Sequence, residues 1–163
     1  ITQTLDEETA QANVALTIQA HQGHSFRFWK NAATDPSLNE PARRLLADAG
    51  LAARRNVQVR DMSHGEHKQL EVAMALASEP RLLLLDEPMA GLGVSESRQM
   101  IDALKTLKGR IAILLVEHDM DAVFALADRI SVLVYGKVIA TGTAQEIQAD
   151  PQVRAAYLGE GDA

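Results

Sequence analysis

Residues 81–88 read Arg-Leu-Leu-Leu-Leu-Asp-Glu-Pro, and this stretch indicates the fold class. Four consecutive leucines predict a β-strand buried on both faces, as in the parallel sheets of α/β proteins. Two carboxylates, Asp86 and Glu87, stand at the carboxyl end of this strand, where open α/β sheets bind their ligands. Because successive side chains of a strand point to opposite faces, the two carboxylates can have different roles. The alternative is a strand that ends in a solvated acidic turn.

The bulk composition restricts the class of protein. The chain has 163 residues, of which 47% are hydrophobic, and this suffices for one domain with an ordinary core. A net charge of −6 argues against a general affinity for nucleic acid or for anionic membranes. The absence of cysteine excludes disulfides and fits a reducing compartment. No apolar run in the sequence approaches the length needed to cross a bilayer.

Helix and strand patterns alternate from Ser63 onward, and this alternation predicts a mainly parallel sheet covered by helices. We expect helices over residues 6–20, 40–49, 65–78, 95–108, 120–127 and 151–158, and strands over residues 81–86, 111–116, 130–135 and 138–141. The last two strands should form a β-hairpin around Gly136-Lys137. Gly50 should cap the C-terminus of the helix over residues 40–49, and Thr143 and Glu146 fit a capping box that begins a further helix. Residues 21–38 include the aromatic side chains of Phe26, Phe28 and Trp29 and the pair Asp35-Pro36, and they are expected to form a loop or a broken helix.

A second candidate segment is Ser63-His64-Gly65-Glu66. Ser63 and Glu66 have the spacing of a capping box, which predicts a helix N-terminus at this point. The free N–H groups of a helix N-terminus suit an oxyanion, and Gly65 would let a phosphate approach the backbone closely. The alternative is a well-capped helix without any ligand.

Two further segments carry polar or glycine residues at positions suited to a ligand site. His118 follows the predicted strand 111–116, so it should share a sheet edge with Asp86 and Glu87 and could donate a hydrogen bond to a terminal phosphate. A lone histidine after a strand is, however, more often structural. Gly91 and Gly93 predict a tight loop that allows close backbone contact, and a simple strand-to-helix connection is the alternative.

In this order and spacing, the segments closely resemble the nucleotide-binding subunits of ATP-binding cassette (ABC) transporters. The resemblance matches Ser63, His64, Gly65 and Glu66 to the signature motif, Leu82–Asp86 to the Walker B strand, Glu87 to the catalytic carboxylate, Ala90, Gly91, Leu92 and Gly93 to the D-loop, and His118 to the switch histidine. The ending from Asp150 to Glu160 resembles the branch that serves branched-chain (hydrophobic) amino acid importers, of which urea importers are close relatives.

The resemblance implies an α/β fold of the P-loop NTPase (RecA-like) class, present here as an incomplete ABC cassette. Residues 1–62 would form part of the helical subdomain. Residues 63–163 would form the C-terminal part of the ATPase core, with a mainly parallel sheet, flanking helices and a terminal β-hairpin. His64 and Gly93 depart from the usual family pattern, which has a glycine and an acidic or amide residue at these positions. The 163 residues contain no Gly-x-x-x-x-Gly-Lys-[Ser/Thr] segment, so we expect a C-terminal portion that lacks the Walker A loop and is inactive alone.

The resemblance also implies roles for the candidate residues, with ATP and Mg²⁺ as the bound groups. Asp86 would hold the metal through water, Glu87 would accept a proton from the attacking water, and His118 would contact the terminal phosphate. The signature residues Ser63 to Glu66 would contact a nucleotide held mainly by a second ATPase subunit.

The implied function is ATP hydrolysis that powers an ABC importer for branched-chain amino acids. The implied partners are a second ATPase subunit, either identical or related, and transmembrane permease subunits, with no nucleic acid. The implied location is the cytoplasmic side of the plasma membrane, peripheral to the inner face. Two alternatives are an ABC ATPase of a soluble DNA-repair or translation machine, and a degenerate cassette that acts only as a binding module.

Overall fold

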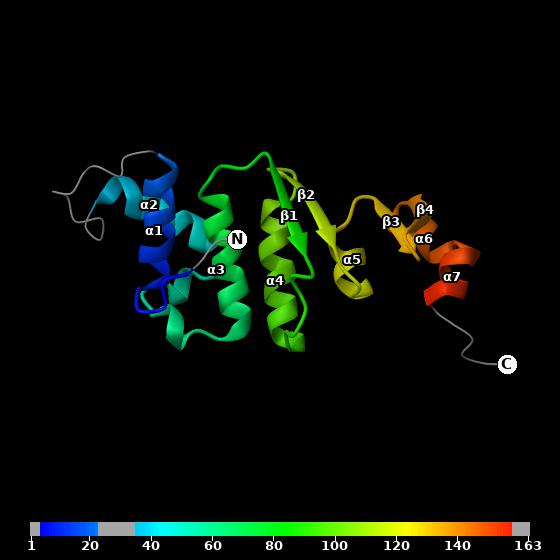
Figure 1. Ribbon diagram of the computed structural model, residues 1–163, viewed down its shortest axis with the longest axis horizontal. Helices are drawn as coiled ribbons and strands as arrows, with labels where there is room; N and C mark the ends of the chain where they lie inside the picture. The colour runs from blue at the N-terminus through cyan, green and yellow to red at the C-terminus, as the bar shows by residue number, and fades with distance from the viewer. Residues whose placement is uncertain (1–3, 23–34, 158–163) are drawn as a thin grey trace. The chain divides into compact units, whose positions relative to one another are not determined.

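A computed structural model describes residues 4–22 and 35–157 of the chain, which divides into two compact units, Ile1–Glu117 and His118–Ala163 (Figure 1). The first unit contains α1 (Ala10–His21), α2 (Pro36–Asp48), the short 3₁₀ turns η2 (Ala52–Arg54) and η3 (Val59–Asp61), α3 (His64–Leu76), β1 (Leu82–Asp86), α4 (Val94–Leu107) and β2 (Ala112–Val116). The second unit contains α5 (Met120–Leu126), β3 (Ile130–Val134), β4 (Lys137–Gly142), α6 (Ala144–Ala149) and α7 (Pro151–Tyr157).

Helix α1 begins four residues later than the sequence pattern predicts. The Thr9 side chain accepts a hydrogen bond from the Ala12 N–H at 3.2 Å and therefore caps the helix at this point. The acidic residues 6–8 precede the helix and do not form its first turn, so that part of the prediction is wrong.

Helix α2 begins at Pro36, four residues earlier than predicted, because Asp35 caps it by accepting a hydrogen bond from the Ser37 N–H at 2.9 Å. Proline suits the first helical position because it has no N–H to leave unsatisfied there. The prediction of a loop or a broken helix over residues 21–38 is therefore wrong at its C-terminal end, where α2 is a regular helix. The middle of this segment, including Phe26, Phe28 and Trp29, lies outside the described residues. Gly50 follows the helix with a φ of +80°, which agrees with its predicted capping role.

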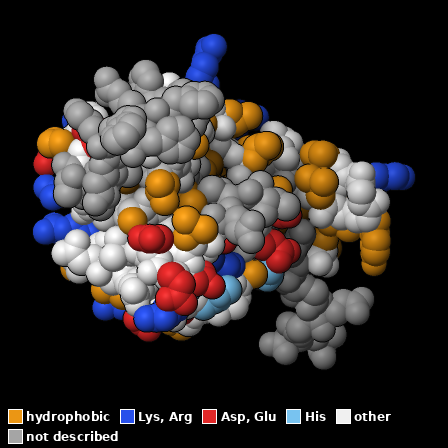
Figure 2. Space-filling model, turned by 60° about the vertical axis from the view of Figure 1, so that its left-hand side comes forward, with side chains coloured by type: hydrophobic (Ala, Val, Ile, Leu, Met, Phe, Trp, Pro, Cys, Tyr) orange, Lys and Arg blue, Asp and Glu red, His pale blue; other side chains and the backbone are white. Residues whose placement is uncertain are grey.

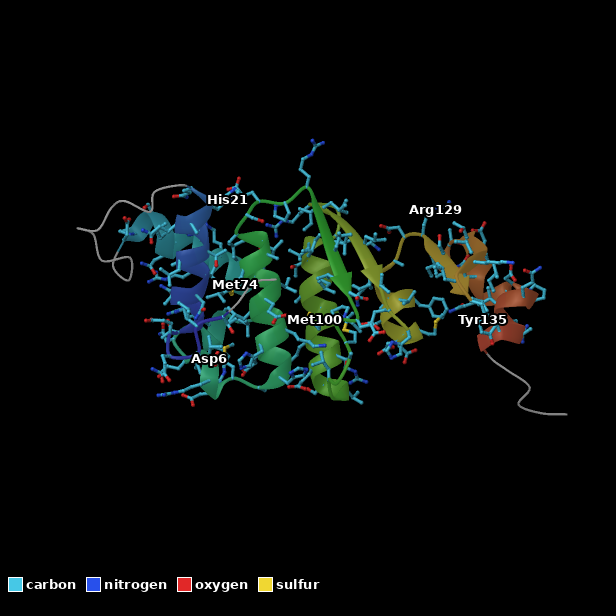
Figure 3. All side chains as sticks on the ribbon, in the orientation of Figure 1. Asp6, His21, Met74, Met100, Arg129 and Tyr135 are labelled. Atoms are coloured by element: carbon cyan, nitrogen blue, oxygen red, sulfur yellow. The ribbon has the colours of Figure 1, made fainter. Side chains whose placement is uncertain are left out.

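One hydrophobic core joins α1, α2 and α3, with η3 contributing Val59. Leu46 of α2 and Leu70 of α3 are completely buried in it. Figure 3 marks Met74 on α3 and Met100 on α4, which are 4% and 0% exposed. Helix α3 also packs against α4, so α3 lies between the two N-terminal helices and the helix that connects β1 to β2. A functional boundary at residue 62 stays a prediction.

Strands β1 and β2 pair in parallel, with Leu82 opposite Ala112 and Asp86 opposite Val116. The predicted burial of β1 on both faces is wrong in this structure. Leu83 is 6% exposed, whereas its neighbour Leu84 is 66% exposed. The exposed row also includes Leu82, Leu114 and Val116. Figure 2 likewise shows hydrophobic side chains at the surface among charged ones. The physical reason is that the single crossover helix between two parallel strands, α4, can cover only one face of the pair.

The second unit is built on the antiparallel hairpin β3–β4. Tyr135 and Gly136 have φ values of +47° and +74°, the pair of left-handed residues that a two-residue hairpin turn requires. The hairpin is therefore confirmed, although its turn lies one residue before the predicted position, and Figure 3 labels the exposed Tyr135. Thr143 and Glu146 form the predicted capping box of α6. Ile147 and Val153 bury against the hairpin.

None of the helices in the described ranges combines the length and the apolar character that crossing a bilayer would require.

Candidate functional site

The start of α3 is held by the capping box that the sequence predicts. The Ser63 hydroxyl oxygen accepts the Glu66 N–H at 3.3 Å, and the Glu66 carboxylate accepts the Ser63 N–H at 2.8 Å. The second carboxylate oxygen of Glu66 lies 2.6 Å from Nε of Arg54, the last residue of η2. The Glu66 side chain is therefore engaged in fixing the helix start.

A carboxylate already occupies the donors at this helix start. Oε1 of Glu96, on α4, accepts hydrogen bonds from the Ser63 hydroxyl at 2.8 Å and from the Gly65 N–H at 3.3 Å. Oε2 of Glu96 accepts the Gly93 N–H at 3.3 Å. The Ser63 hydroxyl, and then the Gly93 N–H, lower the pKa of Glu96 below 4.5. The start of α3 therefore binds one oxygen of an anionic group, here the Glu96 carboxylate of the same chain.

Gly65 makes the close approach of this carboxylate possible. A β-carbon built at Gly65 would lie 2.9 Å from the carboxyl carbon of Glu96, too close for any side chain to fit without displacing it. Sequence reasoning did not select Glu96. Its spacing from Gly93 is that of a residue that caps α4, and this local signal was available. No local signal indicates the contact of Glu96 with Ser63, which lies 33 residues away in the sequence.

The predicted acidic pair lies at the carboxyl ends of β1 and β2. Asp86 ends β1 and is exposed. Glu87 has a φ of +47°, an uncommon conformation for a residue other than glycine, and its N–H donates to the Val116 carbonyl of β2 at 2.9 Å. The Glu117 carboxylate accepts the Met89 N–H at 2.7 Å. The end of β2 thus holds two N–H groups of the turn that carries Glu87, those of Glu87 and Met89. Glu117 is a site residue that the sequence analysis does not predict.

Lys68 of α3 holds the carbonyl groups of the same turn. Its ammonium nitrogen donates to the carbonyl oxygens of Glu87 at 3.3 Å, Pro88 at 3.2 Å and Ala90 at 2.6 Å. No local pattern marks Lys68 in the sequence, because its partners lie 19 to 22 residues away.

The predicted glycine loop, Ala90, Gly91, Leu92 and Gly93, connects this turn to α4. Gly91 has a φ of +75°, and a β-carbon built there would lie 3.5 Å from Nε2 of His64. Gly93 is the N-cap of α4. The structure therefore brings together, within one chain, the start of α3, the turn after β1 and the glycine loop.

His118 follows Glu117 and is the first residue of the second unit. Its neighbour Asp119 caps α5 by accepting the Ala122 N–H at 3.1 Å. The shared pocket of His118 with Asp86 and Glu87 stays a prediction.

The residues at the end of β1 fit a magnesium ion bound together with phosphates. Mg²⁺ commonly takes one or two carboxylates, phosphate oxygens and several waters, and an exposed Asp86 supplies a carboxylate of this kind. Within residues 4–22 and 35–157, no group of three or more His, Cys, Asp or Glu side chains is arranged to enclose a metal ion.

Comparison with known proteins identifies the family. A family model described as "ABC transporter" matches residues 2–90, more than half of the chain. The chain belongs to the ABC transporter family. A second family model, described as "Branched-chain amino acid ATP-binding cassette transporter", matches residues 137–163. Both findings confirm the resemblance that the motifs carry.

Individual relatives agree with this assignment. The chain is 39% identical over 113 residues to the high-affinity branched-chain amino acid transport ATP-binding protein LivG of Salmonella typhimurium, covering 68% of this chain and 44% of LivG. It is 32% identical over 161 residues to BraF of Pseudomonas aeruginosa, which carries the same description, covering 94% of this chain and 63% of BraF. The chain thus spans about half the length of these relatives.

A solved structure confirms the fold class. The crystal structure of an ATP-binding cassette of an ABC transporter in its ADP conformation matches with a TM-score of 0.73 at 26% identity, over 96% of this chain and 65% of that chain. The predicted P-loop NTPase cassette fold is therefore confirmed, and the described residues have the mixed helix and sheet architecture of part of a cassette.

Proposed function

We propose that this chain is part of an ATP-hydrolysing subunit that powers an ABC importer for branched-chain amino acids. The structural observation that carries the proposal is the cluster of the Asp86–Glu87 carboxylates, the glycine loop and the anion-accepting start of α3. The names of the LivG and BraF relatives support the substrate class. The partners are transmembrane permease subunits and a second ATPase subunit, and the chain would lie at the inner face of the plasma membrane.

In this proposal the two carboxylates act on a nucleotide held by their own subunit. Asp86 would hold Mg²⁺ through a water, and the bound metal would supply positive charge beside the phosphates. Glu87 accepts the proton of the water that attacks the terminal phosphate. Phosphoryl transfer depends mainly on positioning and charge stabilisation, so a rigid turn around Glu87 suits the reaction. His118 donates a hydrogen bond to the same terminal phosphate.

The start of α3 acts on the nucleotide of the second ATPase subunit. Ser63 and Gly65 supply the hydroxyl and N–H donors, His64 lies beside them, and Glu66 fixes the helix start through its contact with Arg54. A phosphate oxygen would take the place that the Glu96 carboxylate has in the present structure. Binding in trans therefore includes the release of Glu96.

The phosphate loop for this reaction has to come from residues outside the 163, because no Walker A segment lies among them. We expect the isolated chain to lack most of the affinity for ATP that this loop provides. Isothermal titration calorimetry with Mg-ATP measures the affinity, and micromolar binding would contradict this part of the proposal.

The catalytic test uses the assembly purified from membranes through a tag on this chain. Glu87→Gln should lower ATP hydrolysis about 10²-fold or more, the scale of a lost general base. Glu71→Gln, which changes an exposed glutamate of α3, is the matched control and should stay within about twofold of the wild type. Unchanged turnover in the Glu87→Gln assembly, or an assembly without ATP hydrolysis, would refute the proposal.

A further inference from the structure

Lys68 connects the start of α3 to the turn that carries Glu87. Its ammonium group has three N–H donors, and three carbonyl oxygens of the turn, those of Glu87, Pro88 and Ala90, lie within 3.3 Å of it. The lysine side chain is half-buried, and the contact with Ala90 is the shortest, at 2.6 Å. All the donors of one cation are thus directed at one short segment.

The turn requires such support. Glu87 has a left-handed backbone conformation, which is strained for a residue with a side chain and persists only where surrounding contacts hold it. The end of β2 holds two N–H groups of the turn, through the Val116 carbonyl and the Glu117 carboxylate. On the carbonyl side, the Ala90 N–H donates to the Glu87 carbonyl at 3.1 Å, and Lys68 contacts that carbonyl and two others. Removing the Lys68 ammonium would therefore loosen the backbone that positions the Glu87 side chain.

The same helix carries the two donors that bind the Glu96 carboxylate, the Ser63 hydroxyl and the Gly65 N–H. Ser63 caps α3, and Lys68 lies five residues later, a rise of about 7.5 Å along the helix axis. Lys68 is well inside this 13-residue helix, which is packed into the core through Leu70 and Ala73. A helix held in this way moves as one body, so a displacement at its start is transmitted to Lys68 and to the turn.

We propose that Lys68 is a positioning residue that couples anion binding at the start of α3 to the placement of Glu87. This inference rests on the proposed function, in which the start of α3 contacts the ATP of the second subunit and Glu87 serves the ATP of its own. Lys68 then links the two ATP sites of a dimer, because ATP bound at one site determines the position of the Glu87 carboxylate at the other.

The first test concerns the turn and needs no nucleotide. Lys68→Met keeps the length and the apolar stem of the side chain but removes its charge and donors. In the isolated chain, hydrogen exchange at the Ala90 N–H should become about tenfold faster, whereas exchange at Ala77, at the end of α3, should not change. Lys105→Met is the matched control, because Lys105 is an exposed lysine of α4 whose nitrogen lies 3.9 Å from an Asp102 oxygen.

The second test concerns coupling and uses the membrane-purified assembly. Lys68→Met should lower kcat for ATP hydrolysis about tenfold, change KM by less than about twofold, and bring the Hill coefficient for ATP from above one to one. Lys68→Arg keeps a cation with several donors and should recover kcat to within about threefold of the wild type. A lysine with a merely structural role would leave the Hill coefficient unchanged.

The outcomes separate the inference from the function on which it rests. Wild-type kcat and Hill coefficient in Lys68→Met, or unchanged exchange at Ala90, overturn the role of Lys68. A wild-type assembly without ATP hydrolysis overturns the proposed function and the catalytic coupling, and the exchange measurement then still decides whether Lys68 holds the turn. If far-UV circular dichroism shows that Lys68→Met does not fold, Lys68→Leu, which also lacks the charge and the N–H donors, carries the same expectations.

Discussion

Two neighbouring leucines of β1 should respond very differently to the same truncation. Leu83 is 6% exposed and Leu84 is 66% exposed, although both lie in the middle of the four-leucine run. Leu83→Ala removes methyl groups from a closed interior, whereas Leu84→Ala removes them from an open sheet face. The pair therefore tests whether β1 is buried on one face or on both.

The expected magnitudes follow from burial. Truncating a buried leucine to alanine costs about 2–5 kcal/mol of unfolding free energy, because the removed methyl groups no longer gain from burial and because a cavity remains in their place. Full burial of a leucine side chain stabilises a protein by about 1.5–3 kcal/mol. Since only about a third of Leu84 is covered, Leu84→Ala should cost roughly 0.5–1 kcal/mol. The two variants should differ by about 1–4 kcal/mol.

Urea unfolding followed by far-UV circular dichroism measures this difference. The comparison requires that the slope of free energy against urea is the same for both variants, since a changed slope would indicate a changed denatured state. Unfolding at several protein concentrations shows whether association of the exposed faces contributes. Equal losses for Leu83→Ala and Leu84→Ala at low concentration would refute the one-sided burial of β1.

Three further predictions concern local contacts. Ser63→Ala should raise the pKa of Glu96 in an NMR titration and leave that of Glu146 unchanged, because the pKa of Glu146 is lowered by the N–H and hydroxyl of Thr143. Glu96 has a folded-state pKa below its ordinary value of 4.5, so the stability that it contributes is complete above pH 4.5 and is lost as the pH falls through the folded-state pKa. Ser63→Ala should reduce this loss of stability at acid pH. Identical profiles of stability against pH for the variant and the wild type would contradict the contact between Ser63 and Glu96. Gly50→Ala should lower the free energy of unfolding by about 1–2 kcal/mol because of its left-handed backbone, and further because the new β-carbon would lie 2.9 Å from Nε2 of Gln69 and displace it. Gly109→Ala, with a φ of +80° and open space around it, should show the backbone cost alone in the same urea assay. Asn13→Ala should lower the free energy of unfolding by about 1–3 kcal/mol, because the buried Asn13 amide binds the N–H and carbonyl of Leu5 and the carbonyl of Thr9. Thermal or urea unfolding measures this loss. A loss below the error of the assay would show that water replaces the Asn13 amide in these hydrogen bonds.

The local elements were predictable because their signals are local. The capping pairs Ser63–Glu66 and Thr143–Glu146 begin helices where their spacing predicts them. The order of α3, β1, α4 and β2 follows the predicted alternation to within one or two residues. The start of α2 differs from the prediction because the pair Asp35-Pro36 fits two structures. It is typical of irregular segments, and it also serves as a cap followed by proline at the first helical position, as in this structure.

The family was predictable for a related reason. Several short motifs, each weak alone, occur in one order and at one spacing, and the matches to an ABC transporter family model and to LivG confirm what that order indicates. The domain boundary at residue 62 and the roles of the individual site residues stay predictions.

The amino-acid sequence by itself determined the family, the succession of helices and strands, and the position of the carboxylates at the end of β1. Only the tertiary structure decided that one face of β1 is open, that Glu96 occupies the donors of Ser63 and Gly65, and that Lys68 holds the turn around Glu87. The physical reason is range: caps, turns and periodic patterns act within about one helical turn, whereas these contacts join residues 19 to 33 positions apart, which meet only when separate elements pack together.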